Sequence, residues 1–167
     1  MAFEEIERPS PNRDGAAHER LGVLCHHSEM SFEATIARMQ DPASRVSYHC
    51  LIAPDGKRCT LVPDHEVAWH AGLSRFLGRD RCNDFLLGVA FAGDTYAAPL
   101  SGPQIDSALE WLARRWDFLG WTPGRMTDHR QVSPGRKRDL NPREWDRLAA
   151  AIAARFAGTE PAGPFPS

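Results

Sequence analysis

The order of apolar and polar positions divides the chain into short apolar runs and amphipathic segments. Residues 21–27, LGVLCHH, form an apolar run that ends in two histidines, a pattern typical of a buried strand. Residues 85–93, FLLGVAFAG, are continuously apolar, which predicts a central strand buried on both faces. Residues 31–40, SFEATIARMQ, have the spacing of a short amphipathic helix.

Two further strand candidates are separated by a Pro-Asp-Gly turn. They are residues 45–53, RVSYHCLIA, and residues 57–63, KRCTLVP. Glycine accepts the positive φ that a tight hairpin turn requires. The two segments therefore predict a β-hairpin, with Tyr48 on its first strand.

The signals for a long helix lie between residues 101 and 120. Ser101 and Gln104 have capping-box spacing, Pro103 lies in the first turn, and Gly120 stands where the helix would stop. Apolar residues spaced four, three, four and three apart predict the stripe that faces a sheet. These residues are Ile105, Leu109, Leu112, Trp116 and Leu119.

The last helix carries the same kind of start signal. Asn141 is the predicted N-cap, Pro142 occupies the first helical position, and Glu144 follows three residues after the cap. An alanine-rich stretch continues the helix, which is predicted to end near Gly158.

The alternation of strands and helices predicts the α/β class. We expect a single domain over residues 1–167, with a central mixed β-sheet flanked by helices and a core over about residues 20–157. The ends, residues 1–15 and 158–167, are rich in proline and glycine and are expected to be loose.

The composition of the chain argues against some classes of binding partner. Lys and Arg number 20 against 22 for Asp and Glu, a formal net charge of −2, so nothing favours nucleic acid or a membrane surface. No run approaches the roughly 20 apolar residues of a membrane span. The first residues lack the basic-then-apolar pattern of a signal peptide, so we expect a cytoplasmic monomer. The cysteines show no CxxC pair, which favours four free thiols in or near the core: Cys25, Cys50, Cys59 and Cys82.

Histidine and aspartate positions indicate a metal site. His129 and Asp139 bracket a Pro/Gly-containing loop that could bring both to one point, and residues 26 and 27 supply a further imidazole. Two imidazoles and one carboxylate make a three-ligand set for Zn²⁺ that leaves a fourth position open. Because neighbouring strand residues point to opposite faces, only one of His26 and His27 can reach a given metal. A single histidine is more often a satisfied polar group, but Lys137, two residues before Asp139, strengthens the case.

Three other side chains have two interpretations each. Tyr48 and His70 could be a sheet-packing aromatic and a turn residue, or both could lie on the rim of a zinc cleft. Lys137 could be an ordinary solvated surface charge. In an amide hydrolase it would instead lie near the carbonyl oxygen and stabilise the oxyanion.

Five segments, in chain order, resemble the zinc-dependent N-acetylmuramoyl-L-alanine amidases. They are LGVLCHHS, VSYHCLIAPDGK, EVAWHAG, NDFLLGVAFAGD and TDHRQVSPGRKRDLNP. This superfamily includes AmpD-type recycling amidases, phage lysozyme-type amidases and peptidoglycan recognition proteins. The resemblance covers roughly residues 21 to 148 and implies the amidase-2, peptidoglycan-recognition-like α/β fold.

The resemblance also implies roles for individual residues. The implied zinc ligands are His26, His129 and Asp139, with His26 in the ligand position instead of His27. Lys137 matches the catalytic lysine. The residues that match positions shaping the substrate groove are Arg136, Asn83, Trp69 and His70.

The chain departs from the AmpD-type pattern at one catalytic position. AmpD-type enzymes have a glutamate in the central strand, where this chain has Ala90. Phage-type and recognition-protein amidases have a tyrosine on the hairpin strand and no glutamate, and Tyr48 matches that tyrosine. We therefore expect catalytic assistance from Tyr48 and Lys137, with Tyr48 or His70 as proton partner.

The implied reaction is hydrolysis of the amide between N-acetylmuramic acid, or its 1,6-anhydro form, and L-alanine of the stem peptide. The expected substrates are soluble muropeptides of cell-wall recycling. The alternatives are a phage-type lysin or remodelling amidase acting on polymeric peptidoglycan, and a peptidoglycan-binding module without activity. The last is disfavoured because all three implied ligands and the lysine are present.

Overall fold

The computed structural model describes residues 2–156 and Phe165 of the chain. Six strands form the main sheet in the order β1-β5-β4-β9-β3-β10. They are β1 (Glu5–Glu7), β3 (Gly22–His27), β4 (Cys50–Ile52), β5 (Arg58–Thr60), β9 (Leu86–Phe91) and β10 (Met126–Asp128). β4 and β5 pair antiparallel and the other neighbours pair parallel, so the sheet is mixed, as the sequence predicts.

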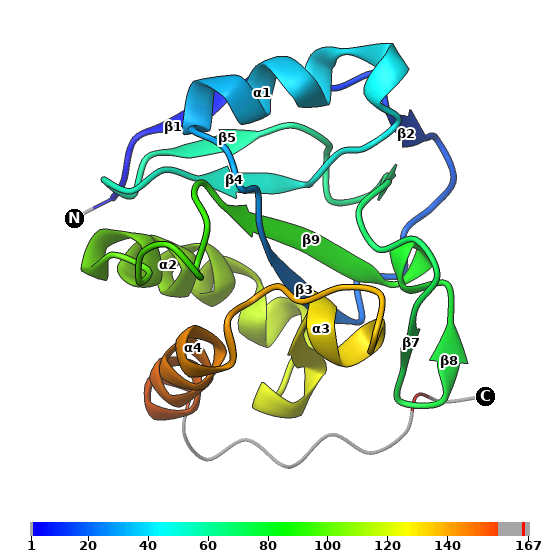
Figure 1. Ribbon diagram of the computed structural model, residues 1–167. Coiled ribbons are helices and arrows are strands. Elements are labelled where there is room, and N and C mark those ends of the chain that lie inside the picture. The colour runs from blue at the N-terminus through cyan, green and yellow to red at the C-terminus, as the bar shows by residue number, and fades with distance from the viewer. Residues whose placement is uncertain (1, 157–164, 166–167) are drawn as a thin grey trace.

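Helices cover both faces of this sheet (Figure 1). The α-helices are α1 (Phe32–Gln40), α2 (Gly102–Leu119), α3 (His129–Val132) and α4 (Pro142–Arg155). α2 and α4 lie on one face and α1 lies on the other. Short 3₁₀ helices span Pro42–Ser44, Cys82–Asp84 and Pro123–Arg125. Among the described residues, no helix is long and apolar enough to cross a membrane.

Two small antiparallel ribbons complete the fold. One joins β2 (Arg13–Asp14) to β6 (Val67–Ala68), and the other joins β7 (Arg75–Phe76) to β8 (Arg79–Asp80). β6 leads directly into the segment around His70, so the first ribbon lies next to the region that the sequence singles out for chemistry.

The two central strands, β3 and β9, are buried along their whole length, as their apolar runs predict. Their parallel register places His26 opposite Ala90. Side chains alternate between the faces of a strand, so Cys25 and Val89 pack under α2 and α4, whereas Ala90 packs with α1. His26 and His27 consequently lie on opposite faces of the sheet.

The start and end signals of α2 are confirmed, and its predicted apolar stripe packs against the core, although only Leu112 and Trp116 of that stripe are buried. The Ser101 and Gln104 capping box is formed, and Gly120 ends the helix at φ 66°. The buried residues are Gln104, Ser107, Ala108, Trp111, Leu112 and Trp116, whereas Ile105, Leu109 and Leu119 are only partly buried. The buried amide of Gln104 donates to the carbonyls of Ile52 and Ala92. The side of α2 that faces the core therefore includes polar residues. A stripe predicted from apolar positions alone is rotated about the helix axis relative to the observed buried side.

α4 begins where predicted, at the Asn141 cap, whose side chain accepts from the Arg143 amide. Glu144 has a different role from the expected capping residue: it is buried and accepts from the Leu100 amide at 3.0 Å. The helix ends at Arg155, three residues before Gly158, which lies outside the described residues.

The predicted hairpin is present as β4 and β5, around Gly56 at φ 91°. Tyr48 is not on its first strand, because β4 begins two residues later. The amides on either side of Tyr48 bond elsewhere: that of Ser47 donates to the Trp69 carbonyl and that of His49 to the Gly88 carbonyl. The backbone around Tyr48 is therefore bonded to segments outside the hairpin.

The expectation of a loose N-terminal segment is wrong. Glu5–Glu7 pairs parallel with β5 as the edge of the main sheet. The buried amide of Asn12 donates to the carbonyls of Met39, Asp41 and Val46, which ties this segment to the end of α1. The tail, residues 158–167, lies outside the described residues except for Phe165, whose ring centroid is 5.0 Å from that of Phe85.

The four cysteines are free and buried, as the sequence predicts. Burial raises the pKa of each thiol, that of Cys59 to about 11. Protonated, buried thiols are poor nucleophiles, so these side chains act as small apolar core residues.

Candidate metal centre and its pocket

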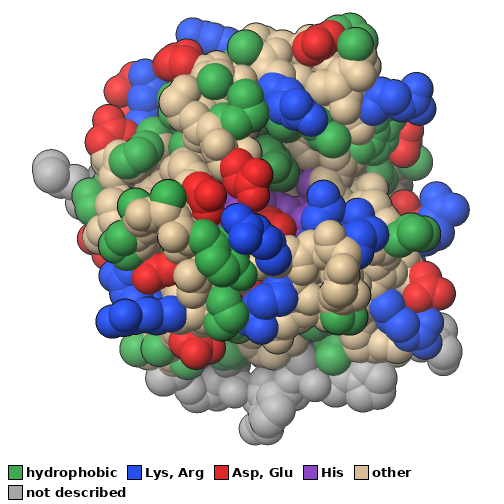
Figure 2. Space-filling view, viewed as in Figure 1, with side chains coloured by type: hydrophobic (Ala, Val, Ile, Leu, Met, Phe, Trp, Pro, Cys, Tyr) green, Lys and Arg blue, Asp and Glu red, His purple; other side chains and the backbone are tan. Residues whose placement is uncertain are grey.

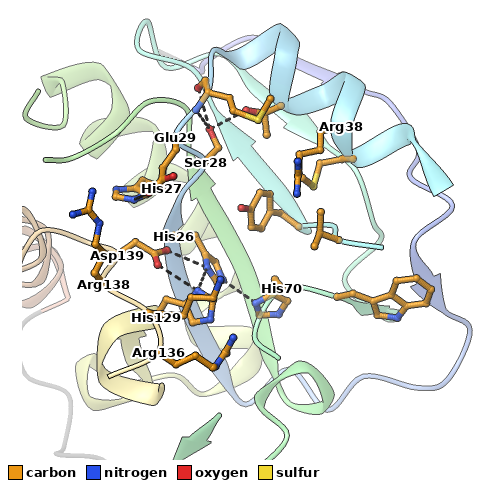
Figure 3. A pocket seen from close by; sticks show the side chains of 17 residues that line it. His26, His27, Ser28, Glu29, Arg38, His70, His129, Arg136, Arg138 and Asp139 are labelled. Carbon is orange, nitrogen blue, oxygen red and sulfur yellow. Dashed lines mark hydrogen bonds and ion pairs between the residues drawn. The ribbon is translucent and has the colours of Figure 1, made fainter. Parts of the chain in front are cut away.

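Three side chains from distant parts of the chain converge at the carboxyl ends of β3 and β10. His26 is the last residue but one of β3, His129 is the first residue of α3, and Asp139 lies shortly before α4. All three side chains are buried. The Nδ1 atoms of the two histidines are 3.0 Å apart, and each lies 3.4 Å from an Asp139 carboxylate oxygen (Figure 3). One ligand atom from each residue lies within 4.8 Å of the others.

The tautomer of His129 follows from its second ring nitrogen. His129 Nε2 is 2.9 Å from the carbonyl oxygen of Ala71. A carbonyl oxygen can only accept, so Nε2 carries the proton. In the neutral ring, Nδ1 then presents a lone pair to the cluster.

A chain of two hydrogen bonds fixes His26 in the same way. His70 Nε2 donates to the Leu86 carbonyl at 3.0 Å, so its Nδ1 must accept. The group at that Nδ1 is His26 Nε2, at 2.9 Å. His26 is therefore protonated at Nε2, and its Nδ1 also presents a lone pair to the cluster.

Two lone pairs and a carboxylate facing one point repel each other unless a cation lies between them. Burial and the neighbouring His129 lower the pKa of His26 to about 4, so it is neutral at pH 7. Burial opposes ionisation of Asp139, but the two imidazoles beside it outweigh burial and lower the pKa of its carboxyl, so Asp139 is ionised at neutral pH. A neutral N, N and anionic O donor set, with the outer ring nitrogens held by hydrogen bonds, fits a divalent metal such as zinc.

The sequence predicts a Pro/Gly-containing loop between His129 and Asp139. In the structure, hydrogen bonds fix both ends of this segment. Asp128 caps α3 by accepting from the Gln131 amide, and its other oxygen accepts from the Leu140 amide at 3.1 Å. The Arg130 amide donates to the carbonyl of Asp139 at 2.7 Å. These bonds join the start of α3 to the residues around Asp139 and hold the carboxylate in place.

His70 lines the pocket, as the resemblance implies, and it also supports the cluster. Both of its ring nitrogens are engaged, one with Leu86 and one with His26. Its ring lies against Gly88, where an added Cβ would be 2.6 Å from the His70 Cγ. Gly88 on β9 thus provides the space that this imidazole needs.

Asn83, also expected in the substrate groove, does not line the pocket. Its Oδ1 accepts from the amides of His70 at 3.0 Å and Ala71 at 2.8 Å. Asn83 therefore positions the short segment that carries both His70 and the carbonyl that holds His129.

The cluster forms the floor of a pocket of about 580 Å³. In Figure 2 the histidine side chains lie at the bottom of this hollow, with Lys and Arg side chains around it. Of the sequence-predicted residues outside the cluster, those lining the pocket are Tyr48, Trp69, His70, Arg136 and Lys137. Lining residues that sequence reasoning missed include Glu29, Arg38, Met39 and Arg138.

Tyr48 lies beside the cluster, with its ring centroid 5.2 Å from that of His26. Burial, and secondarily the charge of Asp139, raises the pKa of Tyr48, so its hydroxyl is protonated at neutral pH. Ala90 is fully buried on the same face. Tyr48 therefore brings a phenol ring with a protonated hydroxyl next to His26, on a face where Ala90 offers no polar group.

Arg136 and Lys137 line the pocket from the segment between α3 and α4. The Arg136 guanidinium donates to the carbonyls of Ala71 and Leu73, at 2.5 and 2.9 Å. Lys137 is exposed, and its ammonium has no hydrogen bond or ion pair among the described residues. Lys137 is thus the more available cation for a ligand at the floor of the pocket.

His27 belongs to a separate contact on the other side of β3. Its Nδ1 accepts from the Thr95 amide at 3.1 Å, and its Nε2 lies 3.3 Å from a carboxylate oxygen of Glu29. The structure therefore brings His26, and not His27, into the cluster.

Comparison with known families agrees with this geometry. The family described as N-acetylmuramoyl-L-alanine amidase matches residues 18–144. A curated relative, 1,6-anhydro-N-acetylmuramyl-L-alanine amidase AmpD of Salmonella typhimurium strain LT2, is 38% identical over 112 residues. That alignment covers 65% of this chain and 58% of the relative, so the match spans less than two thirds of the relative's length.

Solved structures share the fold. A crystal structure of a selenomethionine AmpD derivative superposes with a TM-score of 0.76 at 28% identity, covering 91% of this chain and 96% of that one. The E. coli amidase AmiD, in complex with anhydro-N-acetylmuramic acid-L-Ala-D-γ-Glu-L-Lys, superposes with a TM-score of 0.68 at 28% identity. This second match covers 83% of the present chain and 60% of AmiD.

Proposed function

The chain belongs to the N-acetylmuramoyl-L-alanine amidase family, and on that premise we propose that it hydrolyses the amide joining N-acetylmuramic acid, or its 1,6-anhydro form, to L-alanine of the stem peptide. The observation that carries the proposal is the set of two Nδ1 lone pairs and one carboxylate on the floor of a pocket. When bound there, a zinc ion supplies Lewis acidity that polarises the amide carbonyl and makes water a stronger nucleophile at neutral pH.

The residues around the cluster provide hydrogen-bond donors for this reaction. Lys137 is exposed in the pocket without a partner among residues 2–156 and 165, and we assign its ammonium to the carbonyl oxygen of the scissile amide. Positioned donors of this kind contribute on the order of 10²–10³ in rate. Tyr48 stays protonated and is our candidate for donating to the leaving amine.

We assign the proton-partner role to Tyr48 and not to His70. Its Nε2 proton is directed at the Leu86 carbonyl, and its Nδ1 accepts from His26. Burial, followed by the neighbouring histidines, lowers the pKa of His70 well below its usual value, so it stays neutral. Its part in the proposed reaction is to orient His26.

The size of the pocket favours a soluble substrate fragment. Its volume of about 580 Å³ falls within the roughly 300–1,000 Å³ of small-molecule sites. The AmpD relative is named for the 1,6-anhydro sugar, and the AmiD complex contains an anhydro-muramyl tripeptide. We propose muropeptides of this type, including the L-Ala-D-γ-Glu stem, as substrates of the present chain.

A digest of defined muropeptides, followed by mass spectrometry, tests the proposal. We expect release of the intact stem peptide beginning with L-alanine, loss of the reaction with a chelator, and its return on adding zinc. Cleavage at another bond, or no cleavage by zinc-loaded protein of both soluble muropeptides and whole sacculi, would refute amidase activity. Cleavage of sacculi alone would replace the soluble substrate with polymeric peptidoglycan.

The adjacent histidines offer a matched pair of variants for the same experiment. His26→Ala removes a proposed ligand, whereas His27→Ala removes an imidazole on the opposite face of the sheet. We expect zinc to be lost from the first variant and retained by the second. The monomeric state, the cytoplasmic compartment and the lack of nucleic-acid partners stay predictions from the sequence.

A further inference from the structure

Arg38 is a charged residue of the pocket wall that the proposed reaction does not use. It lies in the last turn of α1 and lines the pocket from that helix (Figure 3). Its side chain is exposed, and among residues 2–156 and 165 its guanidinium has no hydrogen bond or ion pair. A cation held at the rim of a pocket without a partner is available to a ligand.

Most other charged residues of the pocket already have partners within the protein. Asp139 belongs to the ligand cluster, and Glu29 lies 3.3 Å from a ring nitrogen of His27. Arg136 donates to backbone carbonyls, and the guanidinium of Arg138 lies 4.3 Å from the centre of a tyrosine ring.

Of the cations that line this pocket, two have no hydrogen bond or ion pair among the described residues, Lys137 and Arg38. Lys137 is assigned above to the carbonyl oxygen at the reacting bond. Arg38 lies on the wall formed by α1, where its positive charge opposes the burial that raises the pKa of Tyr48. Arg38, Tyr48 and His26 line the same pocket, so the Arg38 guanidinium is available to a ligand that is bound there.

The wall next to Arg38 has the chemistry of a peptide site. Met39, Val46 and Trp69 present apolar surface to the same pocket. An apolar wall with one unpaired guanidinium suits a short peptide that carries a carboxylate. Arginine binds carboxylates with two parallel hydrogen bonds, a geometry that an uncharged carboxamide cannot match in strength.

The proposed substrate has such a carboxylate next to the reacting bond. In an L-Ala-D-γ-Glu stem, the glutamate is linked through its side chain, so its α-carboxylate is free. L-alanine has no charged side chain, so this carboxylate, on the next residue and about 3.8 Å further along, is the first negative charge of the stem peptide. We propose that Arg38 binds this α-carboxylate and thereby makes the enzyme prefer acidic stem peptides over those amidated at the same position. The proposal rests on the function proposed above.

The test compares two muropeptides that differ only at this group, one with D-γ-glutamate and one with its α-carboxamide. Kinetics are measured for the zinc-loaded wild type and for Arg38→Gln, Arg38→Lys and Arg143→Gln. Arg143 is an exposed arginine on α4, away from this pocket, so its variant controls for loss of one positive charge.

We expect the wild type to favour the acidic substrate by about 10- to 100-fold in kcat/KM, the range for a hydrogen bond between charged groups. Arg38→Gln should raise KM for the acidic substrate, keep kcat, and process both substrates about equally. Arg38→Lys should retain part of the preference, and Arg143→Gln should retain all of it.

Wild-type preference that persists in Arg38→Gln would overturn the proposal, as would equal processing of both substrates by the wild type. A loss in Arg38→Gln that is the same for both substrates would also overturn it. If the wild type cleaves neither muropeptide, the proposed function itself fails, which is a different outcome from losing the preference.

Discussion

In each histidine of the cluster, a backbone carbonyl determines which ring nitrogen carries the proton and which presents a lone pair. Ala71 sets the tautomer of His129 directly, and Leu86 sets that of His26 through His70. Backbone carbonyls do not titrate, so these tautomers persist over the pH range in which the rings are neutral. The Nδ1 atoms are thus presented before any ligand arrives, which reduces the cost of binding.

Gly88→Ala is expected to disturb this arrangement without removing a ligand. The added Cβ would lie 2.6 Å from Cγ of His70, so the ring must move away from Leu86 or from His26. Loss of such a supporting hydrogen bond typically costs about 10- to 100-fold in metal affinity. Overpacking costs about 1–3 kcal/mol of stability. Zinc affinity measured by chelator competition, with unfolding followed in parallel, checks both effects.

Gly102→Ala is the matched control. A Cβ at Gly102, the first residue of α2, meets nothing within 4 Å, so zinc affinity and fold should both be retained. If folded Gly88→Ala protein binds zinc as tightly as the wild type, His70 does not orient His26.

The sequence identifies the residue types of the site better than their roles. His129 and Asp139 are candidates because imidazole and carboxylate are common metal ligands, whereas the choice of His26 over His27 comes from the family resemblance. The role of His70 could not be predicted, because it depends on which atoms meet each ring nitrogen, and those come from β3 and β9. Asn83 was misassigned for the same reason: its contacts are backbone amides of a neighbouring segment.

At the scale of secondary-structure elements, the sequence predicts the helix ends correctly but does not predict the pairing of the edge strand β1. The caps of α2 and α4 could be read because each depends on residues within one turn. β1 was missed because Glu5–Glu7 is mostly polar and becomes a strand only by pairing with β5, more than fifty positions along the chain. An edge strand with charged residues carries little hydrophobic pattern.

β10 and α3 position two ligands through one aspartate. Asp128→Ala would remove the N-cap of α3, at about 1 kcal/mol, and leave the buried Leu140 amide without its acceptor, at about 1–3 kcal/mol. We therefore expect a loss of roughly 2–4 kcal/mol in the free energy of unfolding. Weaker zinc binding should accompany it, although Asp128 is not a ligand. Denaturant unfolding of the zinc-free protein measures the first effect and chelator competition the second.

Asp106→Ala provides the comparison for this prediction, since Asp106 is an exposed aspartate on α2 without a side-chain contact among the described residues. Its removal should leave both quantities within about 0.5 kcal/mol of the wild type. Normal zinc affinity in folded Asp128→Ala would mean that the segment around Asp139 is held by other contacts.

At the scale of the whole molecule, the site joins segments that are otherwise distant. The proposed ligands come from the end of β3, the start of α3 and the approach to α4, and residues 26 and 139 are separated by most of the chain. The pocket also gathers Arg38, Arg136, Lys137 and Arg138 against two carboxylates, within a chain whose formal net charge is −2. A concave site with this excess of positive charge attracts anionic substrates.

Because three segments meet only in the folded chain, zinc should bind the native state and hardly the unfolded one. At a free zinc concentration 100 times the dissociation constant, this linkage adds about 2.7 kcal/mol to stability. For a chain of this size, that raises Tm by roughly 5–10 °C.

Thermal unfolding with zinc and with a chelator measures this shift. Asp139→Ala should abolish the shift, whereas His65→Ala, which removes an exposed histidine outside the cluster, should preserve it. A zinc-dependent shift of equal size in all three proteins would show that the metal binds elsewhere. Equal Tm values for the wild type with zinc and with chelator would show that His26, His129 and Asp139 do not hold a metal between them.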